Sequence, residues 1–174
     1  AYVFTNTNGT WSQVQELTAS DATEGSAFGS RVALDGDNCI IGAWAKNSNS
    51  GSAYVFTRTN GTWSQVGDFT APFGAPGDAV GFSVAVDGET FVIGACGANS
   101  SSSAGRAYVL DNTDGTGIEL TELAASNGAV GDRFGWSAAL DGSTCVIGAP
   151  YAQSNSSAGS AYIFTHTNGT WSQV

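Results

Sequence analysis

The chain has 174 residues, of which 41% are apolar and 11% are charged. This apolar content is enough for a packed core and excludes an intrinsically disordered chain. Fifteen acidic and five basic residues give a net charge of −10, which repels phosphate backbones, so nucleic-acid binding is not expected. No apolar run approaches the roughly 20 residues that span a bilayer, so membrane insertion is not expected either.

The phrase AYVF recurs with small variations at a nearly fixed spacing of 52 to 54 residues. Its four copies begin at Ala1, Ala53, Ala107 and Ala161. A period of this length is typical of solenoids and propellers. We therefore predict a single repeat region over residues 1–174, divided into repeats 1–52, 53–106 and 107–160 and a partial repeat 161–174.

Each repeat alternates short β-rich runs with Gly, Asn, Asp and Ser, which predicts strands joined by turns. In the first repeat, residues 31–43 (RVALDGDNCIIGA) predict a hairpin turned at Asp35-Gly36. Residues 53–66 (AYVFTRTNGTWSQV) predict a second hairpin turned at Asn60-Gly61. The second repeat continues the pattern with strands predicted within 81–88, 89–97, 105–112 and 115–123. No segment shows the periodicity of a helix.

Two hairpins give four strands in each repeat, which predicts an all-β fold, a β-propeller of four-stranded antiparallel blades. A blade cannot bury both of its faces alone and must stack against its neighbours. The alternation of side chains agrees, because Tyr54 and Phe56 would point to one face and Val55 to the other, while Val84 opposes Ala85. We expect the aromatic residues to fill the space between blades.

Three segments carry a family resemblance: FGSRVALDGDNCIIGAW (28–44), VGFSVAVDGETFVIGAC (80–96) and FGWSAALDGSTCVIGAP (134–150). They resemble FG-GAP repeats, the units of the β-propeller at the head of integrin α chains and in many extracellular proteins. The third segment contains both name-giving motifs. In the others, Val80 replaces the Phe, and Trp44 and Cys96 replace the Pro.

The resemblance implies that the strand after the FG pair is the innermost strand of its blade. The chain would then hold about three and a half blades. Integrin-like propellers have seven, so we expect either a window from a larger propeller or repeat array, or a ring that two copies complete. The window is favoured because few natural domains begin in mid-blade.

Five asparagines lie in N-glycosylation sequons: Asn8, Asn60, Asn99, Asn155 and Asn168. Three of the sequons read NGT and also fit hairpin turns. The third repeat keeps such a turn at Asp114-Gly115 without the sequon, so the turn is the primary role there. The two NSS sequons lie in long loops where no turn demands Asn. The number of sequons favours a secreted, extracellular or cell-surface glycoprotein.

Calcium is the cofactor that the resemblance implies, since integrin-type repeats that bind it insert an acid-rich loop between the first two strands of a blade. A calcium ion needs six or more oxygen ligands. Here the loops are shortened to DGD, DGE and DGS, and Asp35 and Asp37 are too few and too close in sequence for such a cage. The sequence therefore favours plain tight turns and no cofactor.

The cysteines Cys39, Cys96 and Cys145 form no metal or redox motif. Cys39 and Cys145 share one strand position two blades apart, and regular stacking brings no pair within disulfide distance. Buried thiols are the favoured prediction and an intermolecular disulfide the lesser alternative. The single histidine, His166, lies at a variable strand position, and no serine has an evident base. We therefore predict that the chain is not an enzyme.

Loops on a rigid scaffold usually carry binding, so the longer loops define the candidate ligand face, with Trp44, Trp136 and Tyr151 near it in sequence. The leading hypothesis is a non-catalytic extracellular adhesion or structural protein, a component of a surface fibre, sheath or matrix. Its partners would be other protein chains or neighbouring repeats, with glycans as a further class. The alternatives are a lectin-like, carbohydrate-binding propeller and a calcium-dependent, integrin-like adhesion module.

Overall fold

The computed structural model describes residues 1–72, 74–97, 104–111, 119–152 and 158–174. The strands are β1 (Tyr2–Thr7), β2 (Thr10–Glu16), β3 (Arg31–Asp35), β4 (Asn38–Gly42), β5 (Ala53–Thr59), β6 (Thr62–Phe69), β7 (Val80–Asp87), β8 (Thr90–Ala95), β9 (Arg106–Asp111), β10 (Glu119–Leu123), β11 (Ser137–Asp141), β12 (Thr144–Ala149), β13 (Ser160–Thr167) and β14 (Thr170–Gln173). One short helix, α1 (Lys46–Asn49), follows β4. Within the described ranges, no helix has the length and apolar character needed to cross a membrane.

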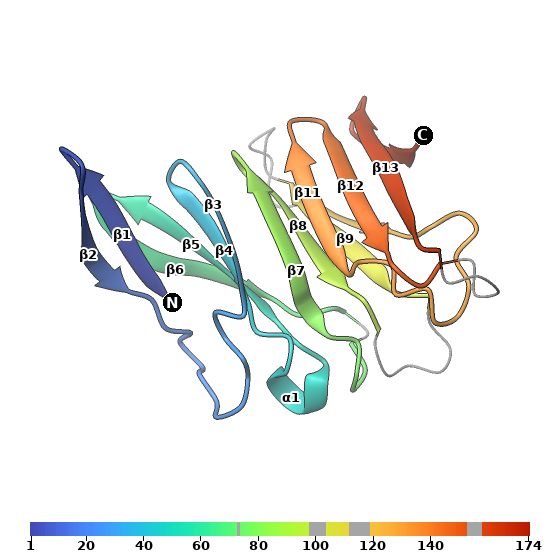
Figure 1. Cartoon of the computed structure of the whole chain (residues 1–174), viewed down its shortest axis with the longest axis horizontal. Coiled ribbons are helices and arrows are strands. Elements are labelled where there is room, and N and C mark those ends of the chain that lie inside the picture. The colour runs from blue at the N-terminus through green and yellow to red at the C-terminus, as the bar shows by residue number, and fades with distance from the viewer. Residues whose placement is uncertain (73, 98–103, 112–118, 153–157) are drawn as a thin grey trace.

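The strands form three four-stranded sheets and one two-stranded sheet, and every pair of neighbours is antiparallel. We call β1–β2 the N-terminal hairpin, β3–β6 blade 1, β7–β10 blade 2 and β11–β14 blade 3. The sheets stand side by side in chain order (Figure 1). The predicted all-β fold with about three and a half four-stranded blades is therefore confirmed.

The first strands of the blades, β3, β7 and β11, are neighbours in space, as expected for the inner strands of a propeller. All three end at an Asp-Gly turn, and these turns define the turn face of the molecule. The opposite end, which carries α1 and the segments that enter β3, β7 and β11, is called the loop face (Figure 1).

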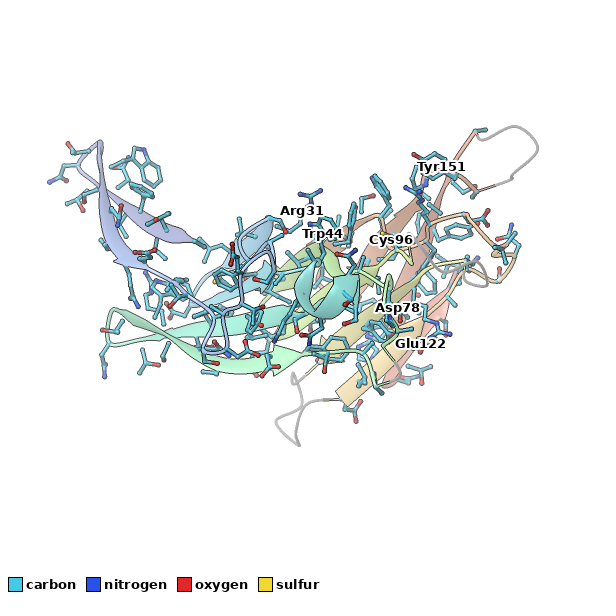
Figure 2. All side chains as sticks on the ribbon, turned by 90° about the horizontal axis from the view of Figure 1, so that it is seen from below. Arg31, Trp44, Asp78, Cys96, Glu122 and Tyr151 are labelled. Atoms are coloured by element: carbon cyan, nitrogen blue, oxygen red, sulfur yellow. The ribbon has the colours of Figure 1, made fainter. Side chains whose placement is uncertain are left out.

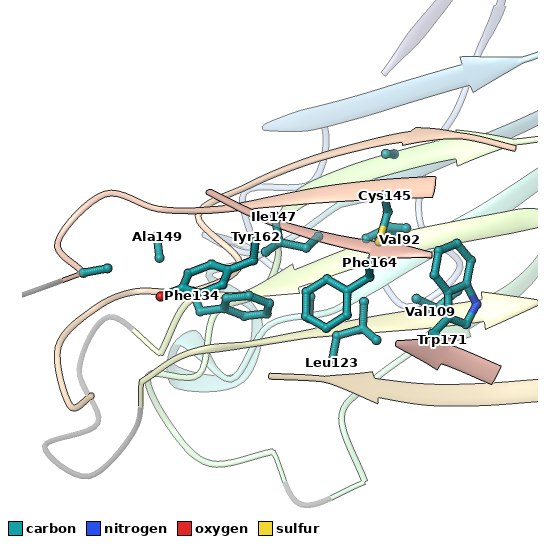
Figure 3. Packing of buried hydrophobic residues seen from close by; sticks show 13 residues of the cluster. Val92, Val109, Leu123, Phe134, Cys145, Ile147, Ala149, Tyr162, Phe164 and Trp171 are labelled. Atoms are coloured by element: carbon teal, nitrogen blue, oxygen red, sulfur yellow. The ribbon is translucent and has the colours of Figure 1, made fainter. Parts of the chain in front are cut away.

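The hydrophobic core is divided among the spaces between successive blades. In the space between blades 2 and 3, Val92 and Val109 of blade 2 pack in one cluster with Phe134 and Phe164 of blade 3 (Figure 3). Equivalent clusters lie between blades 1 and 2 and between the N-terminal hairpin and blade 1. Each cluster draws its side chains from two neighbouring units, so the blades are held together by the same contacts that bury their faces.

The predicted alternation of side chains is confirmed. Tyr54 and Phe56 belong to the cluster between the N-terminal hairpin and blade 1, whereas Val55 packs against the cluster between blades 1 and 2. Val84 packs toward blade 1, and Ala85 belongs to the cluster shared with blade 3. The aromatic residues of the AYVF phrase therefore fill the space between blades.

The inner strands show how much a blade depends on the one before it. Val84 and Val86 of β7 are partly buried against blade 1. Val32 and Leu34 occupy the same repeat positions on β3 but are 62% and 65% exposed. The difference arises because the N-terminal hairpin consists of two strands and leaves the face of β3 uncovered.

Glycine pairs set the distance between blades. Gly42, in β4, meets Gly81 of the next blade so closely that a Cβ atom on Gly42 would lie 2.1 Å from the Gly81 carbonyl oxygen. Gly94 and Gly135 repeat the contact between blades 2 and 3, with a corresponding distance of 2.0 Å. No side chain fits between two backbones at this separation. Gly81 and Gly135, and the glycines of the IGA phrases that precede them, are therefore required by the same contact.

A matched pair of substitutions tests this contact. Gly42→Ala should lower the free energy of unfolding by about 3 kcal/mol, because the added methyl group forces blades 1 and 2 apart. Gly67→Ala is the control, since Gly67 also lies in a strand but a Cβ atom there meets nothing within 4 Å. It should change the stability by less than about 1 kcal/mol. Equal effects in chemical denaturation would contradict the proposed role of the glycine pair.

The Asp-Gly turns also connect neighbouring blades. Asp35 Oδ2 accepts a hydrogen bond of 2.8 Å from the backbone N–H of Gly88, in the turn of the next blade. Asp87 Oδ2 accepts the equivalent bond from Gly142. These carboxylates form a ladder along the turn face. The sequence predicts the tight turns correctly, but this bond across the blades is a further function of the aspartates.

The ladder also offers a matched comparison. Asp87→Ala should lower the free energy of unfolding by about 0.5–1.5 kcal/mol, because the Gly142 N–H loses its acceptor. Asp141→Ala alters the same repeat position, but Asp141 accepts no such bond among the described residues. Its loss should change the stability by less than about 0.5 kcal/mol. Urea denaturation of both variants is the measurement, and an equal loss would show that Asp87 acts only within its own turn.

The Asn-Gly hairpin tips have the predicted turn geometry. Asn8, Asn60 and Asn168 have φ angles of 52°, 51° and 52°, and each precedes a glycine whose φ is also positive. Two successive residues with positive φ form the turn that fits the twist of a β-hairpin. The tryptophans that follow differ, since Trp63 and Trp171 are buried while Trp11 is 68% exposed.

Candidate functional site

Four aromatic side chains form a continuous row on the loop face. Ring centroids lie 6.0 Å apart for Trp44 and Phe82, 4.6 Å for Phe82 and Trp136, and 6.1 Å for Trp136 and Tyr151. We call this row the aromatic strip. Its neighbouring rings meet edge to face or tilted, which is a favourable arrangement for aromatic pairs.

The strip is built by three blades together. Trp44 follows β4 of blade 1, Phe82 lies in β7 of blade 2, and Trp136 and Tyr151 lie just before β11 and just after β12 of blade 3. The structure thus brings together the three residues that the sequence assigns to the ligand face. Phe82, which joins them, is missed by sequence reasoning, although it shares its repeat position with Trp136 in the phrases VGF and FGW.

Two arginines lie over the rings of the strip. The guanidinium carbon of Arg31 is 5.3 Å from the centroid of Phe82. That of Arg133 is 5.3 Å from Trp136 and 4.8 Å from Tyr151. These are cation–π distances, and such contacts hold a guanidinium group near a ring without neutralising its charge.

The strip is accessible from solvent. Tyr151 is 44% exposed, Arg31 is also exposed, and Trp44, Phe82 and Trp136 are half-buried. Figure 2 looks onto the loop face, with Arg31, Trp44 and Tyr151 on the same side of the molecule and Asp78 and Glu122 on the other.

A buried lysine holds the loop next to Trp44 in place. Lys46 is 6% exposed, and its Nζ forms an ion pair with Asp21 and donates a hydrogen bond of 2.7 Å to the hydroxyl of Tyr54. The same hydroxyl donates to Asp21 Oδ1 at 2.7 Å. The hydrogen bonds from Lys46 and Tyr54 lower the pKa of Asp21. Burial opposes the charge of Lys46, but the bonds to Asp21 and Tyr54 outweigh it and raise its pKa. All three groups therefore keep the protonation states that the network needs.

The sequence predicts no helix, whereas the structure has one short, irregular helical turn at α1. Asn47, Ser48 and Asn49 have positive φ angles of 50°, 59° and 65°. The carbonyl of Asn49 accepts a hydrogen bond of 2.8 Å from the N–H of Ala79, at the entry to blade 2. The turn thereby fixes the loop of blade 1 against blade 2 beneath the strip.

The acidic residues that enter the inner strands have partners within the chain. Asp21 pairs with Lys46, and Asp78 and Asp132 each bond within their own loop. Asp132 is 2% exposed, and its Oδ2 accepts from the N–H of Ala129 at 2.7 Å, whereas its Oδ1 has no partner.

The residues of the turn face do not fit a calcium site. Asp35 is engaged with Gly88, and Asp37 Oδ1 accepts from Arg58 Nε at 2.6 Å. In the described part of the chain, no three His, Cys, Asp or Glu side chains are grouped so that they could hold a metal ion. The chemistry of the turns is that of hydrogen-bond acceptors for neighbouring backbone and side chains.

A cleft of about 460 Å³ lies between the outer strands of blade 1 and the strands of blade 2. Its acidic lining residues are Asp37, Asp68, Glu89 and Asp111. Arg58 is the basic residue in the lining, and it is paired with Asp37. The residues of the aromatic strip do not line this cleft.

Cys39, Cys96 and Cys145 are all buried and form no disulfide, which confirms the predicted buried thiols. Burial raises the pKa of Cys39 and of Cys145 to about 11, so both stay protonated and unreactive near neutral pH. His166 is half-buried, and its ring stacks on that of Trp171 at a centroid distance of 5.2 Å.

Three of the predicted glycosylation sites, Asn8, Asn60 and Asn168, are exposed at hairpin tips. Asn99 and Asn155 lie outside the described residues.

Stacked four-stranded antiparallel sheets around neighbouring inner strands, with loops gathered on one face, define a β-propeller module. A family model described as the FG-GAP repeat matches the chain three times in succession, over residues 11–56, 63–110 and 118–164. The chain therefore belongs to the FG-GAP repeat family. A comparison with curated proteins gave no match.

Proposed function

We propose that this chain is a non-catalytic, extracellular adhesion or structural module that binds its partner through the loop face. In this function it would contribute to a surface fibre, sheath or matrix. Its partners would be other protein chains or neighbouring repeats, with glycans as a second class.

The aromatic strip is the observation that supports this proposal most strongly. Aromatic side chains left partly open on a rigid scaffold are typical of binding surfaces. The alternative is a purely structural role, in which the rings only pack over the ends of the stacked blades. Against it, Tyr151 is 44% exposed and Arg31 extends over Phe82 from solvent.

The absence of catalysis is part of the proposal and has specific support. The histidine ring stacks on Trp171, and its Nδ1 is 3.9 Å from Asp111, too far for a hydrogen bond. Asp35 and Asp87 are engaged with backbone groups of neighbouring blades. The ring of His166 and the carboxylates of Asp35 and Asp87 are thus engaged in contacts that hold the fold together.

Glycosylation would place the chain in the secretory route. Enzymatic removal of N-glycans from protein purified from its source should lower its mass, and peptide mapping should locate glycans at Asn8, Asn60 or Asn168, which are exposed. The same chain produced in bacteria without N-glycosylation is the reference. An identical mass before and after treatment would remove the glycoprotein part of the proposal.

Carbohydrate binding is the second candidate. It is favoured by the same strip, because aromatic faces are suited to the apolar faces of sugar rings. Calcium-dependent adhesion has less support, since Asp35 and Asp37 are bonded to Gly88 and Arg58.

An attachment assay tests the adhesion function. Beads coated with the protein should bind intact cells or matrix from its source, and Trp136→Ala or Tyr151→Ala should reduce binding about tenfold or more. Trp11→Ala is the matched control, because Trp11 is 68% exposed in the N-terminal hairpin and outside the strip. Attachment that survives both strip substitutions would exclude the loop face as the binding surface.

A further inference from the structure

We propose that the aromatic strip binds an acidic polysaccharide, with uronate carboxylates held by Arg31 and Arg133. This inference rests on the proposed adhesion function and names the chemical class of its ligand.

The distribution of cations supports an external anion. Three of the five basic residues pair with acids of the chain: Lys46 with Asp21, Arg58 with Asp37 at 2.6 Å, and Arg106 with Glu122 at 3.1 Å. Among the described residues, Arg31 and Arg133 form no ion pair with a carboxylate. Acids outnumber bases three to one in the chain, yet within the described ranges no carboxylate pairs with either arginine of the strip.

The guanidinium groups keep donors for a ligand. Arg31 Nη1 donates to the carbonyl of Ser30 at 2.7 Å, which uses one of five N–H donors. The contacts with Phe82, and with Trp136 and Tyr151, hold each group beside the strip. A guanidinium group can bind a carboxylate through two parallel hydrogen bonds.

The shape of the strip favours a chain of rings. Four aromatic rings follow one another across three blades, so the surface is long and narrow rather than a closed pocket. An extended sugar chain would place its apolar ring faces on the exposed aromatic surface and its carboxylates near the arginines. An acidic peptide would supply the carboxylates but not the repeated rings.

The net charge of −10 includes acids on both faces. On the loop face, Asp21 is paired with Lys46, and Asp78 and Asp132 each accept a backbone hydrogen bond within their own loop. The acids of the Asp-Gly turns and the arginines of the strip lie at opposite ends of strands of five to eight residues. At about 3.3 Å per residue, this separation is roughly 17–26 Å. It exceeds twice the Debye length of about 8 Å at physiological ionic strength, so the repulsion is screened. Nucleic acid remains excluded, because two arginines cannot balance one charge per roughly 1.7 Å of duplex.

Calorimetric titration with defined uronate oligosaccharides is the test. The probes are oligomers of galacturonate, glucuronate and mannuronate, and the methyl ester of each is the neutral control with the same rings. We expect at least one acid form to bind about tenfold or more tightly than its ester. Because this comparison uses the unaltered protein, it does not depend on the folding of any variant.

Substitutions then locate the site. Arg31→Gln and Arg133→Gln together should remove the preference for the acid over the ester. Arg58→Gln is the matched control, since Arg58 also lies over a ring, that of Trp63 at 5.5 Å, but is already paired with Asp37. Its affinity for the uronate should be unchanged.

Each of the following results would overturn the inference. One is that no uronate binds, or that acid and ester bind equally. Another is that polyglutamate binds as tightly as the uronate, which would indicate an acidic protein segment as partner. The third concerns cell attachment: if it is lost in Trp136→Ala but unchanged in the double arginine variant, the adhesion function stands and the acidic ligand does not. Attachment that is unaffected by every strip variant would contradict both the adhesion function of the loop face and the acidic ligand.

Discussion

The backbone contact between glycines of neighbouring blades is the constraint on which the rest of the structure depends. Gly42 and Gly81, and then Gly94 and Gly135, bring the inner part of each blade against the next at a distance that excludes a side chain. The other contacts among blades 1, 2 and 3 form at the distance between blades that these glycine contacts set. The aromatic residues of the AYVF phrase fill the wider outer space, and the carboxylate ladder on the turn face joins turns that the glycine contact has already brought together.

The fold follows from the sequence because its determinants are local. Alternation with a period of two assigns Tyr54 and Val55 to opposite faces, and Asn60-Gly61 fixes a hairpin turn without any distant contact. Three copies of the same local pattern then predict three copies of the same sheet. The aromatic residues near the loop face could also be anticipated, because the phase of the repeat places Trp44, Trp136 and Tyr151 at strand ends on the same face.

The assembled site could not be read from the sequence in the same way, because it depends on contacts between blades. Phe82 bridges residues of two other blades, and Arg31 lies over a ring 51 positions away in the chain. The pairing of Lys46 with Asp21 depends on the conformation of a turn with three left-handed residues, which no periodicity predicts. Such contacts are set by how far each blade is rotated against the next, and one repeat in isolation carries no information on that angle.

The division of the core between blades has a consequence for how the molecule unfolds. A blade that detaches takes with it half of the cluster that its neighbour needs, so the loss of one unit weakens the next. Stability in such an array grows with the number of junctions between blades rather than with the number of blades, as in a one-dimensional cooperative system. Melting is then expected to start at the N-terminal hairpin or at blade 3, which have one junction each, and to reach blades 1 and 2, which have a junction on each side, last.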